Sequence, residues 1–274
     1  RSREALEPLT KLIVNAGNKE TVLRHAGIFG LAGAASPREL KSLSEHSSET
    51  LRIAAVVALR RQGAFDELTA FLDDASPQVM SDAMRAIYDE ASPQTFNDHP
   101  NVLTALATSL DPSRPAPVNV RAIAANRRLG TIEAARRVAA FLTTPKLDPA
   151  LRVEALYSLE SWPDASTLDP MDGRHFPVPQ GDPEVLGEVV GPEIWSLAHD
   201  SHDKVSRRVI ALLRKIEPSP AQLDRVAGFV LDEKQRSSIR IEWLRWLRKQ
   251  KIDLFSSVGV QALASKSVEL RVAA

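Results

Sequence analysis

The sequence predicts an all-α fold, an α-solenoid of about seven repeated helix pairs. One motif recurs along the chain: an aliphatic residue, usually followed by arginine, then small or aliphatic residues at offsets +4, +5, +7 and +8. Because each such repeat buries its apolar face only against its neighbours, the recurrence itself indicates a stack of helix pairs. The copies begin at Leu23, Leu51, Val79, Leu151, Val205, Ile239 and Leu270.

The first helix of each repeat should be packed on two sides. Its apolar offsets cover an arc of roughly 160° on a helical wheel, wider than the apolar stripe of a one-sided surface helix. The residue at offset +4 is small in four copies. We expect these small residues to let neighbouring helix axes approach closely. These small residues are Gly27, Ala55, Ala83 and Ala155.

Helix start signals agree with this register. A residue that favours the N-cap position stands three residues before the first aliphatic residue of four copies, and two of these are followed by proline at the first helical position. The caps are Ser48, Ser76, Asp148 and Ser267, and the prolines are Pro77 and Pro149. A second helix follows each first helix, so the chain should hold about 14 helices in antiparallel pairs.

At these residues the chain resembles HEAT repeats, in particular the short bacterial kind also seen in phycobilisome lyases. The resemblance covers nearly the whole chain and concerns the fold, because helical repeats serve many functions. We expect residues 1–274 to form a single α-solenoid domain. Neither end resembles a capping repeat, so we also expect the chain to be a fragment of a longer protein, with its terminal repeats truncated.

The regular spacing is interrupted once, by a Pro-rich insertion at residues 160–184. Its five prolines exclude a regular helix. Insertions in repeat proteins form loops on one face, often the binding face. We expect this loop to be ordered, with Trp162 packed against the helices and with Arg174 and His175 held by nearby carboxylates or carbonyls. We further expect it to contribute to docking of a partner or neighbouring domain.

The insertion is similar to a stretch in the helical-repeat region of large planctomycete and verrucomicrobial membrane-bound dehydrogenase proteins that carry a haem-binding domain. The matching residues are Leu159, Trp162, Asp169, Gly173, Arg174, His175, Pro177 and Pro179. The resemblance implies a parent protein with a quinoprotein-like propeller, haem c bound at a C-x-x-C-H motif, a quinone cofactor and an exported or periplasmic location. It implies no catalytic residue in this segment, which has neither propeller strands nor that motif.

The arginines at offset +1 form a repeated series with two interpretations. They are either a stripe for phosphates or carboxylates, or a structural ladder in which each guanidinium binds a cap or carbonyl of its own or the adjacent repeat. Because they recur at one fixed offset, we favour the structural ladder. Its members are Arg24, Arg52, Arg152, Arg240 and Arg271.

Residues 234–251 combine basic and aromatic side chains, a pattern that also occurs in nucleic-acid-binding proteins. Trp243 and Trp246 fall at the core offsets +4 and +7, however, so we favour a core role for both. Arg245, Arg248 and Lys249 share the opposite face. They are candidate interaction residues, together with Trp162, Asp169, Arg174, His175 and Phe176 of the insertion.

His199, His202 and Asp203 are weak candidates for a metal site, because two imidazoles and a carboxylate suit zinc or iron. They lie in a turn between helices, where Asp and Ser also serve as caps. His175, with Asp169 and Asp172 nearby, is a second weak candidate. We expect neither group to bind a metal, and no catalytic or cofactor-binding residue stands out in the sequence.

The composition favours a binding role. Lys and Arg balance Asp and Glu at 35 each, so no net charge attracts nucleic acid, and the absence of cysteine excludes thiolate chemistry. We therefore expect a non-catalytic interaction or scaffold module, the spacer of a larger dehydrogenase-like protein, which binds protein or flanking domains and does not insert into a membrane. The alternatives are a nucleic-acid-binding protein similar to alkylpurine DNA glycosylases, and a lyase or metal-dependent enzyme.

Overall fold

The structure is a computed structural model that describes residues 3–17, 19–250 and 252–274. The chain divides into two compact units. Unit 1 comprises residues 1–134 and 165–179, and unit 2 comprises residues 135–164 and 180–274. The chain therefore passes from one unit to the other three times. The single domain over residues 1–274 stays a prediction.

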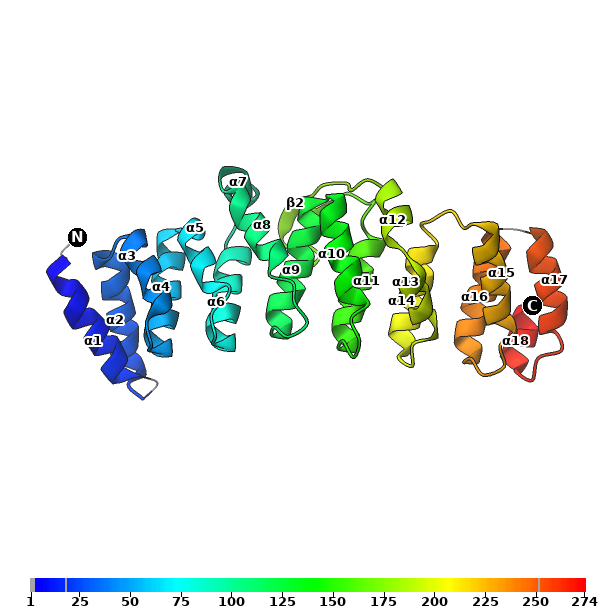
Figure 1. Cartoon of the computed structure of the whole chain (residues 1–274), viewed down its shortest axis with the longest axis horizontal. Coiled ribbons are helices and arrows are strands. Elements are labelled where there is room, and N and C mark those ends of the chain that lie inside the picture. The colour runs from blue at the N-terminus through cyan, green and yellow to red at the C-terminus, as the bar shows by residue number, and fades with distance from the viewer. Residues whose placement is uncertain (1–2, 18, 251) are drawn as a thin grey trace. The chain divides into compact units, whose positions relative to one another are not determined.

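The predicted all-α class is confirmed. The described residues form 18 α-helices, four 3-10 helices and two short strands, and Figure 1 shows the helices packed in successive pairs. The elements of unit 1 are η1 (Arg3–Ala5), α1 (Leu6–Ala16), α2 (Thr21–Ala34), α3 (Pro37–Ser42), η2 (Leu43–Glu45), α4 (Glu49–Gln62), α5 (Phe65–Leu68), η3 (Thr69–Phe71), α6 (Pro77–Tyr88), α7 (Pro93–Asp98), α8 (Pro100–Thr108), α9 (Ala116–Leu129), β1 (Ser166–Leu168) and β2 (His175–Val178).

Unit 2 is likewise built mainly from paired helices. Its boundary with unit 1 falls inside α10, after Ala134. The elements are α10 (Ile132–Leu142), α11 (Pro149–Glu160), α12 (Glu184–Val189), α13 (Pro192–Ser196), η4 (Leu197–His199), α14 (Asp203–Leu213), α15 (Pro220–Leu231), α16 (Ser237–Gln250), α17 (Ile252–Ala262) and α18 (Val268–Ala273). The count exceeds the expected 14 or so because several second helices are divided into short pieces.

The predicted helix starts are confirmed. Ser48, Ser76, Asp148 and Ser267 each accept a backbone N–H from the first turn of the helix that follows. Pro77 and Pro149 occupy the first helical positions of α6 and α11, where a missing N–H costs no hydrogen bond. The register deduced from the repeat is therefore the register of the first helices.

The small residues lie where helices pack against each other. Ala55, Ala83 and Ala155 are fully buried. In the first repeat a Cβ on Gly27 would come within 2.8 Å of the Ile13 side chain on α1. Close approach of the helices therefore depends on the lack of side-chain volume at this offset.

The insertion has more regular structure than the sequence predicts. We expected a loop without regular structure, but β1 and β2 pair as an antiparallel two-stranded sheet, with Ser166 opposite Val178 and Leu168 opposite His175. Gly173 closes the turn with φ +72°, a left-handed conformation that glycine adopts without strain. The prolines exclude a helix, but those on the open edges of a short hairpin do not interrupt its pairing.

Among the described residues, no helix has both the length and the apolar character needed to span a membrane.

The buried alanines provide a test of the packing. Replacing Ala155 by leucine adds volume to the full interior of unit 2 and should lower the free energy of unfolding by about 1–3 kcal/mol. Urea denaturation followed by tryptophan fluorescence measures this, because all four tryptophans lie in unit 2. Ala150→Leu, on the exposed side of the same helix, is the matched control and should be close to neutral. Equal effects of the two variants would contradict the assigned register.

Candidate interaction surface

The hairpin of the insertion is attached to unit 1 through a buried polar cluster. The Tyr88 hydroxyl, at the end of α6, donates to Asp169 Oδ2 over 2.8 Å. Arg128, near the end of α9, forms an ion pair with the same carboxylate and donates from Nε to the Tyr88 hydroxyl over 3.3 Å. Side chains from two helices and the insertion therefore satisfy one another inside unit 1.

The environment fixes the protonation of this cluster. Burial raises the pKa of the Tyr88 phenol well above its ordinary value, so the phenol stays neutral and acts as a donor. Burial alone would also raise the pKa of Asp169. Hydrogen bonds from Tyr88, from Arg128 and from the Met171 N–H outweigh it and hold the pKa of Asp169 below its ordinary value. Asp169 is therefore the carboxylate partner of a buried guanidinium.

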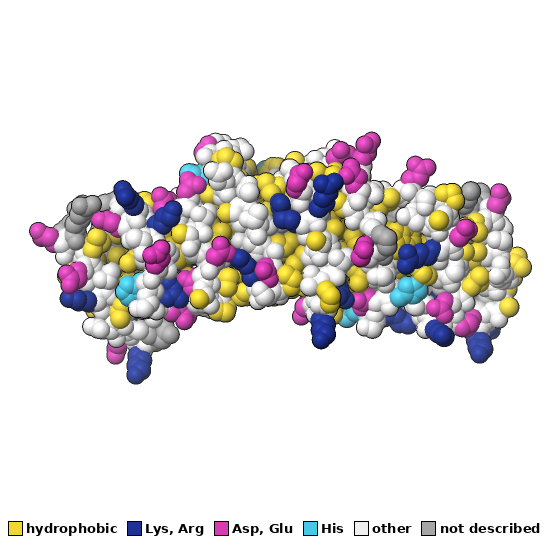
Figure 2. Space-filling model, viewed as in Figure 1, with side chains coloured by type: hydrophobic (Ala, Val, Ile, Leu, Met, Phe, Trp, Pro, Cys, Tyr) yellow, Lys and Arg dark blue, Asp and Glu magenta, His cyan; other side chains and the backbone are white. Residues whose placement is uncertain are grey.

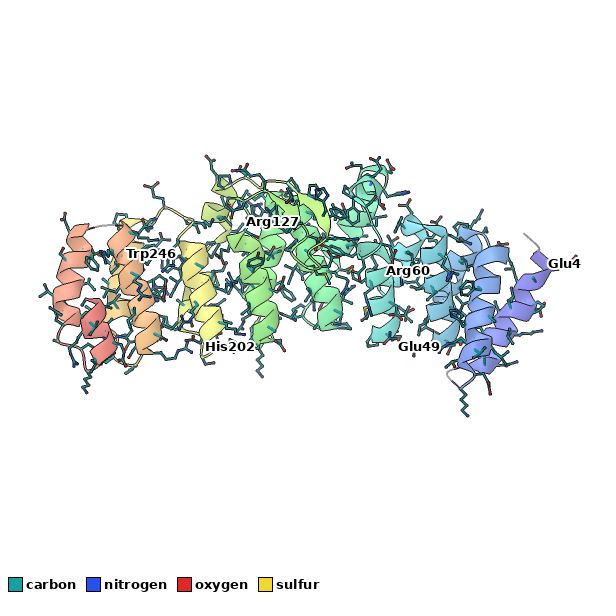
Figure 3. All side chains as sticks on the ribbon, turned by 180° about the vertical axis from the view of Figure 1, so that it is seen from behind. Glu4, Glu49, Arg60, Arg127, His202 and Trp246 are labelled. Carbon is teal, nitrogen blue, oxygen red and sulfur yellow. The ribbon has the colours of Figure 1, made fainter. Side chains whose placement is uncertain are left out.

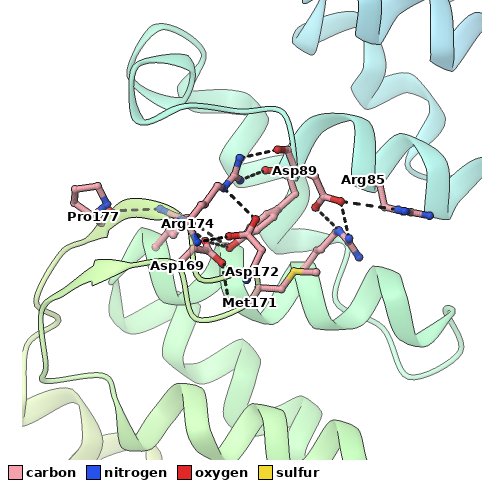
Figure 4. Close-up of polar contacts among 10 residues, drawn as sticks. Arg85, Asp89, Asp169, Met171, Asp172, Arg174 and Pro177 are labelled. Atoms are coloured by element: carbon pink, nitrogen blue, oxygen red, sulfur yellow. Dashed lines mark hydrogen bonds and ion pairs between the residues drawn. The ribbon is translucent and has the colours of Figure 1, made fainter.

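The arginine of the insertion, Arg174, binds the end of α6 (Figure 4). Arg174 donates to the backbone carbonyls of Asp89 and Tyr88 over 2.6 and 2.5 Å, and its Nε lies 3.0 Å from Asp172. These are carbonyls that the end of a helix leaves without an intrahelical partner. Arg174 thus acts as a C-terminal cap supplied from a distant part of the chain.

Aromatic contacts complete the attachment. The Phe176 ring is buried 5.8 Å from that of Phe96, and the Arg128 guanidinium lies 3.4 Å from the Phe176 centroid. Residues 121–128 of α9 are all buried, three arginines among them. Arg121 pairs with Asp89 over 2.7 Å, and Arg127 donates to the Pro179 carbonyl over 2.9 Å. The burial of these arginines was not predicted from the sequence, because a basic residue ordinarily indicates an exposed position.

Trp162 belongs to unit 2, where its side chain is fully buried. The Gly181 N–H donates to the Trp162 carbonyl over 2.9 Å. A Cβ at position 181 would lie 2.5 Å from the indole ring, so glycine is required for this close approach. The backbone hydrogen bond and close packing between Gly181 and Trp162 therefore join the two ends of the insertion.

The insertion residues that we proposed for partner contact therefore have other roles. Trp162, Asp169 and Phe176 are buried, and Arg174 is bound to helix-end carbonyls. Their side chains are occupied inside the fold, because each fills space or satisfies a polar group there. His175 is exposed on β2, and its ring makes no hydrogen bond to a described residue, contrary to our expectation.

The offset +1 arginines make contacts of the kind expected of a structural ladder. Arg52 binds Asp74 through Nε and Nη2, over 2.7 and 3.0 Å. Arg152 binds Asp200 over 2.8 Å. Both aspartates lie in the linker before the next first helix, where each also accepts a backbone N–H.

Arg240 and Arg271 bind groups at or near the linker before their own helix. Arg240 donates to the Val230 carbonyl and to Glu233, and Arg271 to the Ser265 carbonyl. Arg24 also has a partner. We propose on these contacts that the ladder is structural.

The basic segment of α16 has a buried and an exposed side. Trp243 and Trp246 are buried, and Trp243 stacks against Trp195 at a centroid distance of 6.1 Å. Arg245, Arg248 and Lys249 are exposed, and Arg245 pairs with Glu242 over 3.0 Å. The indoles are therefore inaccessible to a nucleic-acid base, while the three basic side chains remain candidates for an interaction surface.

Two of the candidate metal ligands, His199 and Asp203, contact other groups. The His199 ring packs edge-on against Phe229 at 4.1 Å, and burial lowers the pKa of this imidazole. His202 occupies the N-cap position of α14, and Asp203 accepts from Arg207 over 2.6 Å. Nowhere in residues 3–17, 19–250 and 252–274 do three or more His, Asp or Glu side chains gather as metal ligands would.

An open groove of about 720 Å³ runs across three successive first helices of unit 1. Its buried or partly buried apolar residues, Ile28, Ile53 and Val57, are called its floor, and its polar lining residues are called its rim. The lining consists of Thr21, Val22, Arg24, His25 and Ile28 of α2, Glu49, Ile53 and Val57 of α4, and Gln78 and Asp82 of α6. These residues lie mostly at offsets that the repeat motif leaves unspecified, so the sequence did not indicate the groove.

A smaller depression of about 230 Å³ extends the groove along α4 and α6. The two share Val57 and Asp82. Figure 3 labels Glu49 and Arg60 on α4; Glu49 lines the larger depression and Arg60 the smaller one. Unit 1 thus presents a continuous strip of surface over its first helices that is large enough for a segment of another chain.

No protein-family model and no curated protein matches the chain. Among solved structures, an engineered protein is similar with a TM-score of 0.48 and 16% identity, over 98% of this chain and 72% of that one. A designed armadillo repeat protein in complex with the peptide (KR)4 has a TM-score of 0.42 and 14% identity, over 98% and 95% of the two chains. Another designed armadillo repeat protein has a TM-score of 0.41 and 14% identity, over 98% and 96%.

These similarities are too distant to assign a function. The fold itself defines the class: the chain is an all-α helical-repeat protein. A more particular assignment has to come from its own surface.

The buried phenol provides a test of the attachment of the insertion. Tyr88→Phe removes a donor to a buried carboxylate and should cost about 1.5–3 kcal/mol of the stability of unit 1. Hydrogen exchange of α9 amides, followed by mass spectrometry, reports on this unit, because the tryptophans do not. Tyr157→Phe, at a partly exposed tyrosine of unit 2, should leave α9 exchange unchanged. Unaltered protection of α9 in Tyr88→Phe would show that the bond contributes little.

The lowered pKa of Asp169 predicts a pH dependence. An ordinary aspartate in the unfolded chain has a pKa of about 3.9. Because the pKa of Asp169 is lower in the folded chain, its ionised carboxylate stabilises the fold. This stabilisation is fully present above the unfolded pKa of about 3.9 and is lost as the pH falls through the folded pKa. Asp169→Asn should therefore be less stable than the native chain at neutral pH. In the acidic range, hydrogen exchange of its α9 amides should depend less on pH than in the native chain. Parallel pH profiles for the two proteins would contradict this role.

Proposed function

We propose that this chain is a protein-interaction module that binds a segment of another protein, or of its own parent chain, on the exposed face of its first helices. The observation that supports this is the groove across α2, α4 and α6, which combines an apolar floor with a polar rim. Small numbers of polar groups around an apolar surface are typical of binding sites. We propose a scaffold role without catalysis of its own.

More specifically, we propose that the chain is the spacer module of a larger bacterial protein resembling the haem-binding dehydrogenases. The support is the motif in residues 159–179. Asp169, Gly173 and Arg174 of this motif attach the hairpin to unit 1, so their part in the motif has a structural reason. The reading frame around the chain is the test: a C-x-x-C-H motif downstream or a propeller upstream supports this parent, and a complete frame with neither contradicts it.

A nucleic-acid function has less support. The aromatic side chains of the basic segment are buried, and Figure 2 shows acidic and basic side chains interspersed over the visible face. Binding of single strands ordinarily depends on exposed aromatic rings within a positively charged groove.

The interaction role predicts selectable ligands. Random peptides displayed on phage and selected against the immobilised chain should yield a shared sequence pattern, with a Kd in the micromolar range measured by calorimetry. The same chain should bind duplex or single-stranded DNA no more tightly than about 10⁻⁶ M at physiological salt. Peptide selection without enrichment, together with nanomolar DNA binding that weakens as salt rises, would overturn the proposal.

A further inference from the structure

The charged groups of the groove differ in how they are paired. In the smaller depression Arg60 pairs with Glu90, while Arg85 and Arg121 both pair with Asp89. At the α2 end of the groove Arg24 also has a partner, and the His25 ring packs edge-on against Phe29. The arginines of the smaller depression are therefore already paired with carboxylates of unit 1.

Two carboxylates of the groove are not neutralised in this way. Glu49 is exposed in the first turn of α4, and Asp82 accepts a hydrogen bond from Gln78 over 2.9 Å. Neither forms an ion pair with a described residue. Between and beside them lie Ile53 and Val57, which are only partly buried. The groove thus offers two carboxylates without a direct ion pair next to apolar surface.

The dimensions suit an extended chain. Packed helices are about 8–10 Å apart, so crossing from α2 over α4 to α6 covers about 20 Å. An extended peptide advances about 3.3 Å per residue, which corresponds to about six residues. Alternate side chains of such a segment point to opposite sides, so some face the apolar floor and others reach the rim.

We propose that this groove binds an extended peptide segment in which aliphatic residues alternate with basic ones. The aliphatic side chains cover Ile53 and Val57, and lysine or arginine reaches Glu49 and Asp82. The inference rests on the proposed function, because it names the chemistry of the segment that the interaction module binds.

The first experiment compares short labelled peptides by fluorescence anisotropy. The probe alternates lysine with leucine, and the two comparison peptides alternate glutamate with leucine and lysine with serine. The lysine–leucine peptide should bind at least about tenfold more tightly than either, a difference of about 1.4 kcal/mol. Its binding should weaken as salt is added, because exposed charges contribute. Equal binding of all three peptides, or none, would overturn the inference.

A pair of matched variants locates the site. Glu49→Lys combined with Asp82→Lys reverses the two groove charges and should reduce binding of the lysine–leucine peptide at least about tenfold. The control combines Glu67→Lys with Asp98→Lys. Glu67 lies in the first turn of α5 as Glu49 does in α4, and Asp98 accepts from Gln94 as Asp82 does from Gln78. The control has the same net charge and should bind as the native chain does.

The outcome separates this inference from the proposed function. If both double variants lose binding equally, net charge rather than the groove attracts the peptide, and the inference fails. Peptides from phage selection that bind the Glu49→Lys, Asp82→Lys variant unchanged would leave the interaction role standing at another surface. Ile53→Ser tests the apolar floor and should also weaken binding, with hydrogen exchange of α4 confirming that the variant remains folded.

Discussion

The structure depends on the packing of each first helix between two neighbours. A helix in this position has little room for side chains at the contact offset, so that residue is small, and the ends of the helix need polar partners supplied by adjacent segments. Arg52 and Arg152 meet this requirement in the same way, each binding an aspartate of the linker before the next first helix. Such pairs contribute modestly to stability, and we suggest that they fix the register of adjacent repeats.

The insertion supplies polar partners to α9 in a different way. Residues 121–128 of that helix are buried, so its three arginines need partners inside the protein. The hairpin supplies two of them: the Asp169 carboxylate for Arg128 and the Pro179 carbonyl for Arg127. A guanidinium without such partners would be costly to bury. This explains why polar and proline-rich residues occur where the repeat pattern alone would place a regular second helix.

Much of the fold was predictable because its signals are local. The apolar offsets, the N-cap residues and the N1 prolines all lie within a few positions of the helices they specify, and the structure confirms them. The burial of Arg121, Arg127 and Arg128 was not predictable, since their partners are 32 to 52 residues away and a charged residue ordinarily indicates solvent. The β-hairpin was missed for a related reason: its strands are short, and its anchors lie on other elements.

The candidate surface illustrates the same limit. Ile53 and Val57 stand at outward offsets where the motif specifies no residue type, so a single copy carries no visible pattern. Only the stacking of α2, α4 and α6 turns such isolated side chains into a groove. The insertion residues, by contrast, stood out in the sequence because they are unusual, and in the structure Asp169 and Arg174 bind groups of α6 and α9.

The divided sequence of unit 1 has a consequence for how the chain acquires its structure during synthesis. Because residues 165–179 complete this unit, its last helices emerge from the ribosome well before the segment that covers them. Arg128 leaves the ribosome 41 residues ahead of Asp169. At elongation rates of about 5–20 residues per second, α9 has to wait seconds for its partners. The amino-terminal repeats are therefore made first, but the unit they belong to closes only when the insertion has been synthesised.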